Sequence, residues 1–311
     1  MKLTIVTTLY NSSRTIGEFV RRASAVAEKV AGSYEIVIVD DGSPDNSLEL
    51  ALAMTKDRPQ LKIVELSRNF GHHKALMTGL MHAEGERVFL IDSDLEEAPE
   101  LLKPFWEELD RTDADVVYGY QRTRGGSLLR KVSGAVSYWI FEKLIPYKIP
   151  RNHITLRLMC RDYVRSLVLH KEQQTVIGGL WVITGYRQIG IPVDKSTRKE
   201  STYRFFHRLQ MMIDSVTSFS EAPLVFIFYL GLTISFAAGL YALTLVVRWL
   251  FGGVGVDGWV SVMVSVWFLG GLLMFSVGVL GIYLSKVFIE TKNRPYTIVR
   301  RVHKGGASVP R

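Results

Sequence analysis

Two long segments of the sequence contain no charged residue. Residues 224–247 read LVFIFYLGLTISFAAGLYALTLVV, and residues 259–285 read WVSVMVSVWFLGGLLMFSVGVLGIYLS. As an α-helix with a rise of about 1.5 Å per residue, each can cross the roughly 30 Å hydrocarbon core of a bilayer. Buried helices of soluble proteins rarely run beyond about 20 residues without a charge. The sequence therefore predicts two transmembrane helices, joined into a hairpin by the short, glycine-rich stretch RWLFGGVGVDG.

The charged residues that flank these segments predict their orientation. The connecting loop offers only Arg248 and Asp257, whereas basic residues precede the first segment and follow the second. Because positively charged loops favour the cytoplasmic side, we expect an inner-membrane protein with both termini in the cytoplasm. The basic residues are Arg198, Lys199, Arg204 and Arg208 before the hairpin, and Lys286, Lys292, Arg294, Arg300, Arg301 and Lys304 after it.

A segment that mixes basic and large apolar residues precedes the hairpin. Residues 202–220 read TYRFFHRLQMMIDSVTSFS. Their near-helical spacing is typical of an amphipathic helix on a membrane surface, and an ordinary amphipathic core helix is the alternative. The predicted organisation is thus a cytoplasmic domain over residues 1–200, an interfacial helix over 201–222, two transmembrane helices over 223–285 and a basic cytoplasmic tail over 286–311.

The first 200 residues alternate short β-rich runs with helical patterns. The runs LTIVTTL, YEIVIVD, LKIVELS, RVFLID and ADVVYGY are nearly continuous apolar stretches, as expected of strands covered on both faces. Helical patterns lie between them over residues 15–30, 47–56, 74–83 and 99–109. This alternation predicts a Rossmann-like α/β fold with a mostly parallel sheet and helices on both faces. In such sheets, ligands bind outside the carboxyl ends of the strands.

Polar residues gather at those carboxyl ends. TTLYNSS follows the first strand, DDGSPDNS the second, SRNFGHH the third and DSDLEE the fourth. No GxGxxG or GxxxxGK[ST] motif follows any of them, which argues against the Rossmann dinucleotide site and the P-loop. Carboxylates repel phosphates unless a divalent cation lies between them, so Asp92 and Asp94 could share Mg²⁺ or Mn²⁺ with a diphosphate. The alternative for Asp-x-Asp alone is a turn that precedes the next helix.

Taken together, these stretches resemble family 2 glycosyltransferases, whose nucleotide-binding α/β domain is called GT-A. The resemblance rests on TLYNSS, VIVDDGSPDNS, LSRNFGHHKALMTGLMHAEGE and LIDSDLEEAPE. Further along, LRLMCRDYV, SFSEAPL and GIYLSKVFIETKNRPYTIV are similar to one branch of the family, which transfers a sugar to a polyprenyl phosphate. That branch includes bactoprenol glucosyltransferases and dolichol-phosphate mannose synthases, and the resemblance covers essentially the whole chain.

This resemblance implies a metal-dependent, inverting enzyme. It would transfer a sugar from a nucleotide-diphosphate sugar, most often UDP-linked, to a polyprenyl phosphate such as undecaprenyl phosphate, with Mg²⁺ or Mn²⁺ as cofactor. The resemblance assigns donor binding to Thr8, Tyr10, Asn11, Asp40, Asp41, Asp92, Arg198, Ser201 and Tyr203. It assigns the metal to Asp94 and Asp92, and assigns catalysis and the acceptor phosphate to these two with Arg122, Arg130, Lys131 and Ser133.

Two departures from the family pattern leave an alternative open. Glu96 and Glu97 would place more negative charge beside a bound metal than the usual residues, and Thr155 replaces an aspartate. The alternative is a membrane-anchored protein that binds a nucleotide sugar, or serves as a scaffold, without turnover. A phosphate acceptor, however, has a second pKa of about 6 and is already anionic near neutral pH. It therefore needs positioning more than deprotonation.

The composition restricts the partners further. The net charge of +8 favours an anionic partner, but no nucleic-acid-binding motif appears, so no nucleic acid is expected. The single cysteine, Cys160, excludes an internal disulfide and a cysteine-based zinc site. His72 and His73 either touch the donor or form a surface pair, and Trp181 either packs in the core or contacts sugar or lipid. A homo-oligomer is compatible with the sequence.

Overall fold

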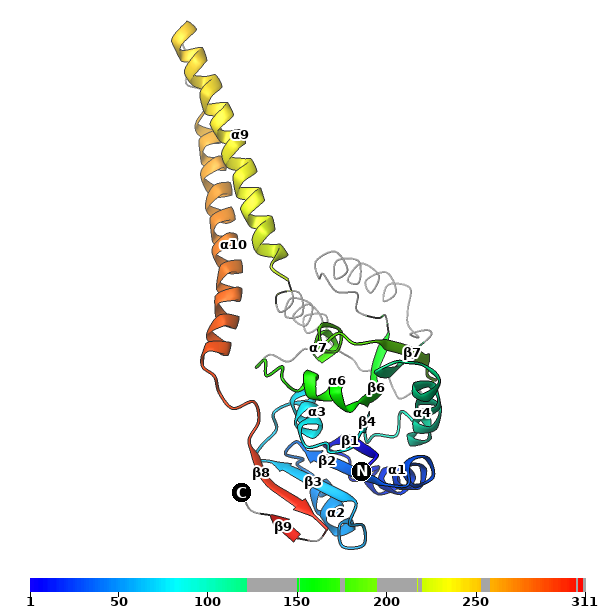
Figure 1. Ribbon diagram of the computed structural model, residues 1–311. Coiled ribbons are helices and arrows are strands. Elements are labelled where there is room, and N and C mark those ends of the chain that lie inside the picture. Colours follow the sequence, from blue (N-terminus) through cyan, green and yellow to red (C-terminus); the bar gives the residue numbers. More distant parts are fainter. Residues whose placement is uncertain are drawn as a thin grey trace. The chain divides into compact units, whose positions relative to one another are not determined.

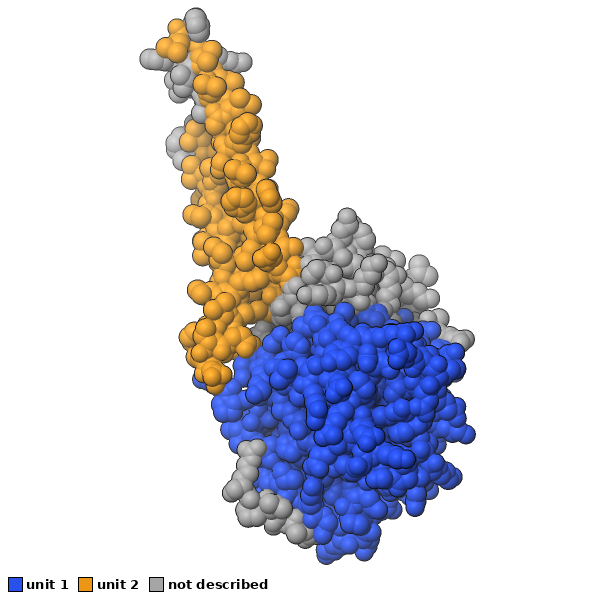
Figure 2. Space-filling model, viewed as in Figure 1, with its two compact units in different colours: residues 1–135, 147–202, 294–311 blue, residues 136–146, 203–293 orange. Residues whose placement is uncertain are grey.

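The structure divides the chain into two compact units (Figure 2). It is a computed structural model that describes residues 1–121, 150, 152–173, 177–194, 217, 220–252, 258–305 and 307–309. The units comprise residues 1–135, 147–202 and 294–311 in the first, and residues 136–146 and 203–293 in the second. The first unit therefore includes the segment that follows the second apolar helix.

One mixed sheet organises the first unit (Figure 1). Among the described residues its strands are β1 Leu3–Leu9, β2 Tyr34–Asp40, β3 Leu61–Leu66, β4 Arg87–Leu90, β5 Val116–Tyr120, β6 His153–Cys160, β7 Gln188–Pro192, β8 Val299–Lys304 and β9 Ala307–Val309. Their order across the sheet is β7-β5-β6-β4-β1-β2-β3-β8-β9. The central strands β4, β1, β2 and β3 pair in parallel, and so do β5 and β7. The pairs β4–β6, β5–β6, β3–β8 and β8–β9 are antiparallel.

Helices cover both faces of this sheet. They are α1 Ile16–Ala31, α2 Ser47–Met54, α3 His72–Met81, α4 Leu102–Arg111 with the preceding 3₁₀ turn η1 Pro99–Leu101, α6 Arg161–Leu167 and α7 Ile177–Ile183. On one face, Phe19 of α1 and Phe105 of α4 join one buried core with strand residues such as Ile5. On the opposite face α3 packs so closely that a Cβ on Gly79 would lie 2.5 Å from Val6 Cγ1. Ile5 and Val6 face opposite sides of the sheet, because successive side chains of a strand alternate between its two faces.

These elements confirm the predicted α/β fold. The five predicted strands appear as β1 to β5, and the four helical patterns appear as α1, α2, α3 and η1 with α4. The sheet is parallel at its centre and mixed beyond it, because β6 runs antiparallel between β4 and β5. Of the predicted interfacial segment 201–222, the described residues are too few to test a helix.

Trp181 packs in the core, as one of the two interpretations expected. It is 4% exposed, and the guanidinium carbon of Arg157 lies 3.1 Å from the centroid of its ring. The hydroxyl of Tyr163 donates to the Trp181 carbonyl at 3.0 Å. Burial lowers the pKa of Arg157 to about 9, so this side chain is still a cation at neutral pH. The ring face of Trp181 offers it the cation–π contact that partly replaces water.

Strand β8 was not predicted from the sequence. It runs antiparallel to β3, with Val302 opposite Val64. The segment before it is also held, because Thr297 Oγ1 lies 2.9 Å from Thr78 Oγ1 of α3 and the Ser67 N–H donates to the Ile298 carbonyl at 2.9 Å. The chain therefore leaves the first unit before the apolar helices and returns to the same sheet after them.

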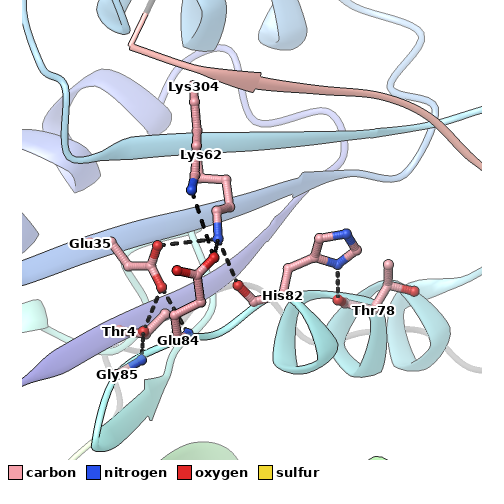
Figure 3. Close-up of polar contacts among 8 residues, drawn as sticks. All are labelled: Thr4, Glu35, Lys62, Thr78, His82, Glu84, Gly85 and Lys304. Atoms are coloured by element: carbon pink, nitrogen blue, oxygen red, sulfur yellow. Dashed lines mark hydrogen bonds and ion pairs between the residues drawn. The ribbon is translucent and has the colours of Figure 1, made fainter. Parts of the chain in front are cut away.

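Glu84 links a buried lysine of β3 to the returning strand at the amino-terminal edge of the sheet (Figure 3). Lys62 is 4% exposed, and its Nζ lies 2.6 Å from Glu84 and 3.3 Å from Glu35. It also donates to the His82 carbonyl at 2.9 Å. Lys304 of β8 reaches Glu84 at 3.7 Å. A buried cation without such partners would be strongly destabilising, so these contacts account for the lysine in β3.

The second unit contains two long apolar helices, as predicted. They are α9 Ala222–Gly252 and α10 Trp259–Thr291. Within them, Ala222–Tyr241 and Ser265–Thr291 each have a mean hydropathy of 2.0 and are long and apolar enough to cross a membrane. Large apolar side chains along them are exposed, with Trp267 at 79% and Phe236 at 76%. The hydroxyl of Thr233 donates to the Tyr229 carbonyl within its helix, an arrangement suited to an apolar solvent.

We expect β8 to be required for the stability of the first unit. Val299 is 7% exposed, so Val299→Asp would bury a carboxylate beside β3. The free energy of unfolding should fall by about 2–4 kcal/mol. Thermal unfolding and trypsin resistance of the purified protein in detergent would measure this. The matched control is Arg301→Gln, an exposed position of the same strand. Equal stability of the two variants would contradict a structural role for β8.

Candidate functional site

A pocket of about 400 Å³ lies at the carboxyl ends of the central strands. Its volume is in the usual range for small-molecule sites, and its position is the one expected for ligands of a parallel sheet. The lining comes from the segments that follow β1, β2 and β4 and from the start of α3. The lining residues are Thr8, Tyr10, Ser12, Asp41, Asn69, Gly71, His72, Asp92, Ser93 and Asp94.

The side chain of Asp45 holds the loop after β2 through several hydrogen bonds. This carboxylate accepts the Ser43 hydroxyl at 2.6 Å, the Ser13 N–H at 3.2 Å, and both the N–H and the hydroxyl of Ser47. Burial would raise the pKa of Asp45, but these hydrogen bonds lower it well below its usual range. The Ser43 hydroxyl in turn accepts the N–H of Asn11 at 2.9 Å. The loops that follow β1 and β2 are thus joined before any ligand binds.

The loops that follow β2 and β3 touch backbone to backbone. Gly42 has φ +64°, and a Cβ at this position would lie 2.6 Å from the Asn69 nitrogen. Only glycine permits both the backbone conformation and the close approach. Asp40, two residues before Gly42, is 2% exposed and accepts the Ser43 N–H at 3.3 Å. Burial raises the pKa of Asp40 to about 6, although the hydrogen bond from Ser43 acts against the shift.

Asp41 holds the turn that precedes α3. One of its oxygens accepts the Phe70 N–H at 2.7 Å and the other accepts the Gly71 N–H at 3.0 Å. Burial raises the pKa of Asp41, and these two hydrogen bonds partly oppose the rise. Gly71 has φ +98°, a conformation that side chains rarely adopt. The contacts of Asp41 therefore fix the backbone at the residue directly before His72.

His72 lies between the ends of β1 and β4. Its Nδ1 is 3.2 Å from Thr8 Oγ1, and its Nε2 is 3.5 Å from Asp92 Oδ1. Burial lowers the pKa of His72 below its usual value of about 6.5, so the ring is neutral near neutral pH. The adjacent His73 is not among the residues that line the pocket. The sequence alone did not tell which of the two histidines faces the ligand site, and the structure gives them different surroundings.

The segment after β4 presents two carboxylates. The Ser93 hydroxyl between them donates to the Thr8 carbonyl at 2.7 Å and so ties the segment to β1. Asp94 accepts the Glu96 N–H at 2.9 Å, and Leu95 between them has φ +62°. Positive φ is uncommon outside glycine, and such residues cluster at functional sites. The backbone thus holds Asp92 and Asp94 at the pocket in a constrained turn.

The structure brings together part of the predicted site. Thr8, Tyr10, Asp41, Asp92 and Asp94 line the pocket, whereas Asn11, in the loop after β1, and Asp40, at the end of β2, are not among its described lining residues. Seven predicted residues fall outside the described part of the chain: Arg122, Arg130, Lys131, Ser133, Arg198, Ser201 and Tyr203.

The two unusual glutamates do not line the pocket. Glu97 is 2% exposed, and neither it nor Glu96 is among the described lining residues. The lining also includes residues that were not predicted as site residues. A signal for some of them exists in SRNFGHH, which follows a strand of the central sheet. They are Ser12, Asn69, Gly71 and Ser93, together with His72, for which the sequence left a contact with the donor and a surface pair open.

Asp92 and Asp94 suit a divalent cation shared with a ligand. Within the described ranges, no cluster of three or more His, Cys, Asp or Glu residues could hold a metal. Such a cluster would be typical of a closed zinc site. Mg²⁺, by contrast, is commonly bound by one or two carboxylates together with substrate phosphates. The donor set of this pocket fits the second arrangement.

Several known proteins are similar to this chain. A model described as glycosyl transferase family 2 matches residues 4–168. A Mycobacterium tuberculosis protein with a provisional glycosyltransferase name is 50% identical over 97% of this chain and 89% of that protein. An Escherichia coli protein named as a prophage bactoprenol glucosyl transferase homolog is 31% identical over 98% of this chain and 100% of that protein. Among solved structures, S. aureus TarS 1–349 in complex with UDP-GlcNAc aligns over 70% of this chain and 66% of that chain, with 20% identity and a TM-score of 0.47.

The buried Asp40 should make stability depend on pH. Its folded-state pKa of about 6 exceeds the usual value of about 3.9. The folded protein therefore binds this proton more tightly, and the free energy of unfolding falls as pH rises from about 4 to about 6. Asp40→Asn keeps a carbonyl oxygen for Ser43 and removes the charge. Above pH 6 the variant should be more stable than the wild type by about 1–3 kcal/mol.

Unfolding in detergent at pH 4.5 and pH 7.5 would measure this difference. The advantage of Asp40→Asn should appear at the higher pH and largely vanish at the lower one. Asp162→Asn is the control, because the Asp162 side chain is 81% exposed. A difference that is the same at both pH values would contradict the raised pKa of Asp40.

Proposed function

Since the chain belongs to glycosyl transferase family 2, we propose that it transfers a sugar from a nucleotide-diphosphate sugar to a polyprenyl phosphate. One observation carries the proposal. The carboxylates of Asp92 and Asp94 meet at a strand-end pocket in a chain that also has two exposed, membrane-length apolar helices. The donor is UDP-linked and the acceptor is undecaprenyl phosphate, at the inner leaflet of the cytoplasmic membrane.

The pocket supports a diphosphate donor through its chemistry. Asp92 and Asp94 would hold Mg²⁺ or Mn²⁺, which when bound supplies positive charge to the departing diphosphate. Asp40 and Asp41 would receive hydrogen bonds from the base or ribose, with Thr8, Tyr10 and Asn11 nearby in the β1 loop. Arg198, Ser201 and Tyr203 would reach the donor diphosphate. The relatives named bactoprenol glucosyl transferase support the lipid acceptor.

The proposed reaction is a single displacement at the anomeric carbon. An acceptor phosphate oxygen forms the new bond to this carbon while the bond from the carbon to the diphosphate oxygen breaks. Attack opposite the leaving group inverts the configuration. Arg122, Arg130, Lys131 and Ser133 would orient the acceptor phosphate through charge-assisted hydrogen bonds. Because the nucleophile is already anionic near neutral pH, orientation supplies more of the rate than a general base does.

The apolar helices serve the acceptor. Drawing a polyprenyl chain into water would cost about 0.8 kcal/mol for each CH₂. An enzyme that stays at the membrane avoids this cost. Two spans return the chain to the side on which it started, and this agrees with the pairing of β8 with β3 in the first unit. The basic flanks of the hairpin favour the cytoplasm for that side.

Asp94→Asn should reduce transfer by about 100-fold or more, since the lost carboxylate helps to stabilise charge in the transition state. Purified protein would be incubated with radiolabelled UDP-sugars, undecaprenyl phosphate and Mg²⁺ or Mn²⁺, and lipid-extractable label would be counted. Asp162→Asn is the matched control at an exposed aspartate. Unchanged label from Asp94→Asn would overturn the role of Asp94, and the absence of label from every nucleotide sugar would overturn the proposed reaction.

The proposed topology can be tested with cysteines, because Cys160 is the single native cysteine. In a Cys160→Ala background, a membrane-impermeant maleimide should label Gly258→Cys, between the helices, in intact cells. Lys292→Cys, after α10, should be labelled only after the cells are disrupted. Labelling of both positions in intact cells would contradict two spans, and the reverse pattern would contradict the orientation.

A further inference from the structure

We infer that His72 is a positioning residue that orients the Asp92 carboxylate, and that Asp41 acts through His72 by holding its backbone. The inference rests on the proposed function, because it concerns the carboxylate that would face the donor diphosphate. It assigns a role to His72, for which the sequence had allowed either a contact with the donor or a position in a surface pair. It also gives Asp41 a second role, as a support of the loop, beside the contact with the donor that is proposed above.

Asp41 holds the backbone of the turn before His72. Both carboxylate oxygens of Asp41 are engaged by successive N–H groups, those of Phe70 and Gly71. Each bond is charge-assisted and partly buried, so the pair fixes the turn more firmly than neutral hydrogen bonds would. Gly71 precedes α3 with φ +98°. The direction in which His72 leaves the first turn of α3 is therefore determined by Asp41.

The helix that carries His72, α3, is packed tightly against the sheet. The residues of α3 from Ala75 to Leu80 are buried, and Gly79 lets the helix pack directly on Val6 and Val39. The side chain of Thr78 also lies 2.9 Å from that of Thr297, in the segment that precedes β8. A side chain at the start of a helix held in this way has little freedom to shift along the sheet.

The two ring nitrogens of His72 face different partners. A ring nitrogen that carries a proton donates a hydrogen bond, and one without a proton accepts it. An Nε2 without a proton would turn its lone pair toward the Asp92 carboxylate at 3.5 Å, which is repulsive. The Nε2–H form instead presents a donor to Asp92, while Nδ1 accepts the hydroxyl proton of Thr8 at 3.2 Å. The ring thereby links the end of β1 to the segment after β4.

The side chains of His72 and Asp92 differ in how far they are exposed to the pocket. The side chain of His72 is 47% exposed and that of Asp92 is 22% exposed, so one face of the ring is open to the pocket while Asp92 lies deeper. At 3.5 Å the contact between Nε2 and Asp92 Oδ1 is longer than a typical N–H···O hydrogen bond, and its electrostatic attraction favours one orientation of the Asp92 carboxylate. A fixed Asp92 carboxylate would hold a divalent cation in one position. That cation would supply positive charge where negative charge develops on the leaving diphosphate, an interaction that is stronger in the transition state than in the ground state.

The test uses variants that separate the two ring nitrogens. The amide nitrogen of His72→Gln can occupy the position of Nε2, whereas His72→Asn ends near the position of Nδ1. His72→Ala removes both, and His73→Ala is the matched control at the neighbouring histidine outside the pocket lining. The full-length protein in detergent would be assayed for kcat, for KM of the UDP-sugar, for Mn²⁺ binding by electron paramagnetic resonance in the presence of UDP, and for Tm.

We expect His72→Ala to lower kcat by about 10- to 100-fold, with a smaller change in KM, as is typical of losing a partner that orients a ligand. Mn²⁺ affinity in the presence of UDP should fall by about 10-fold. His72→Gln should recover much of both losses and His72→Asn should not, while Tm and His73→Ala stay close to the wild type. Asp41→Asn should lower kcat by a larger factor in the wild type than in His72→Ala, because part of its effect passes through His72, and the loss that remains in His72→Ala reports its own contact with the donor.

Several results would overturn the inference. One is a His72→Ala variant that matches His73→Ala in kcat and Mn²⁺ affinity. Another is equal recovery by Gln and Asn, which would indicate simple packing. If His72→Ala fails to fold, the contrast between Gln and Asn decides the question. A wild-type protein that neither transfers sugar nor binds UDP with Mn²⁺ would refute the proposed function itself, whereas an active wild type with an unaffected His72→Ala refutes only the positioning role.

Discussion

The parallel pairing of β1 with its two neighbours is the constraint on which the rest of the first unit depends. Leu9 at the end of β1 lies opposite Asp40 at the end of β2, and Val6 lies opposite Leu90 at the end of β4. Three loops therefore leave the sheet at one edge. Their contacts with one another follow from this register, and a shift by one residue would turn each strand's inward side chains outward. The pocket lies where these three ends come together with the segment that follows β3, which contributes Asn69 and Gly71.

The loops at this edge are held by their own hydrogen bonds before a ligand is present. Asp45, Asp41 and Asp94 each accept backbone N–H groups from nearby turns. A carboxylate used in this way does two things, since it satisfies buried donors and places negative charge near the pocket. The aspartates of the VDDGS and DSD motifs are thus structural elements of the loops as well as candidate ligand contacts. Preorganisation of this kind reduces the entropy that ligand binding must overcome.

Much of this arrangement could be predicted from the sequence, because the signals are local. The apolar runs of β1 to β5 and the position of Asp92 and Asp94 after β4 are visible in the order of residues alone. Strand β8 was missed because VRRVHK carries four basic side chains, and its place beside β3 depends on a pairing between segments far apart in the chain.

The position of His72 escaped prediction for a related reason. Its contacts depend on how α3 begins, which in turn depends on Asp41 in another loop. The expected effect of Glu97 on a metal was likewise drawn from position in the sequence, whereas the structure buries this side chain away from the lining of the pocket. Local patterns therefore identified the elements, and the contacts between loops required the fold.

The return of the chain to β3 also sets an order of events during synthesis. A ribosome completes α9 and α10 before it makes Val299 to Lys304, so β3 remains an open edge until both apolar helices have been produced. An exposed edge strand invites pairing with other chains. In the interval between the synthesis of β3 and that of β8, this edge of the sheet is therefore open to pairing with other chains.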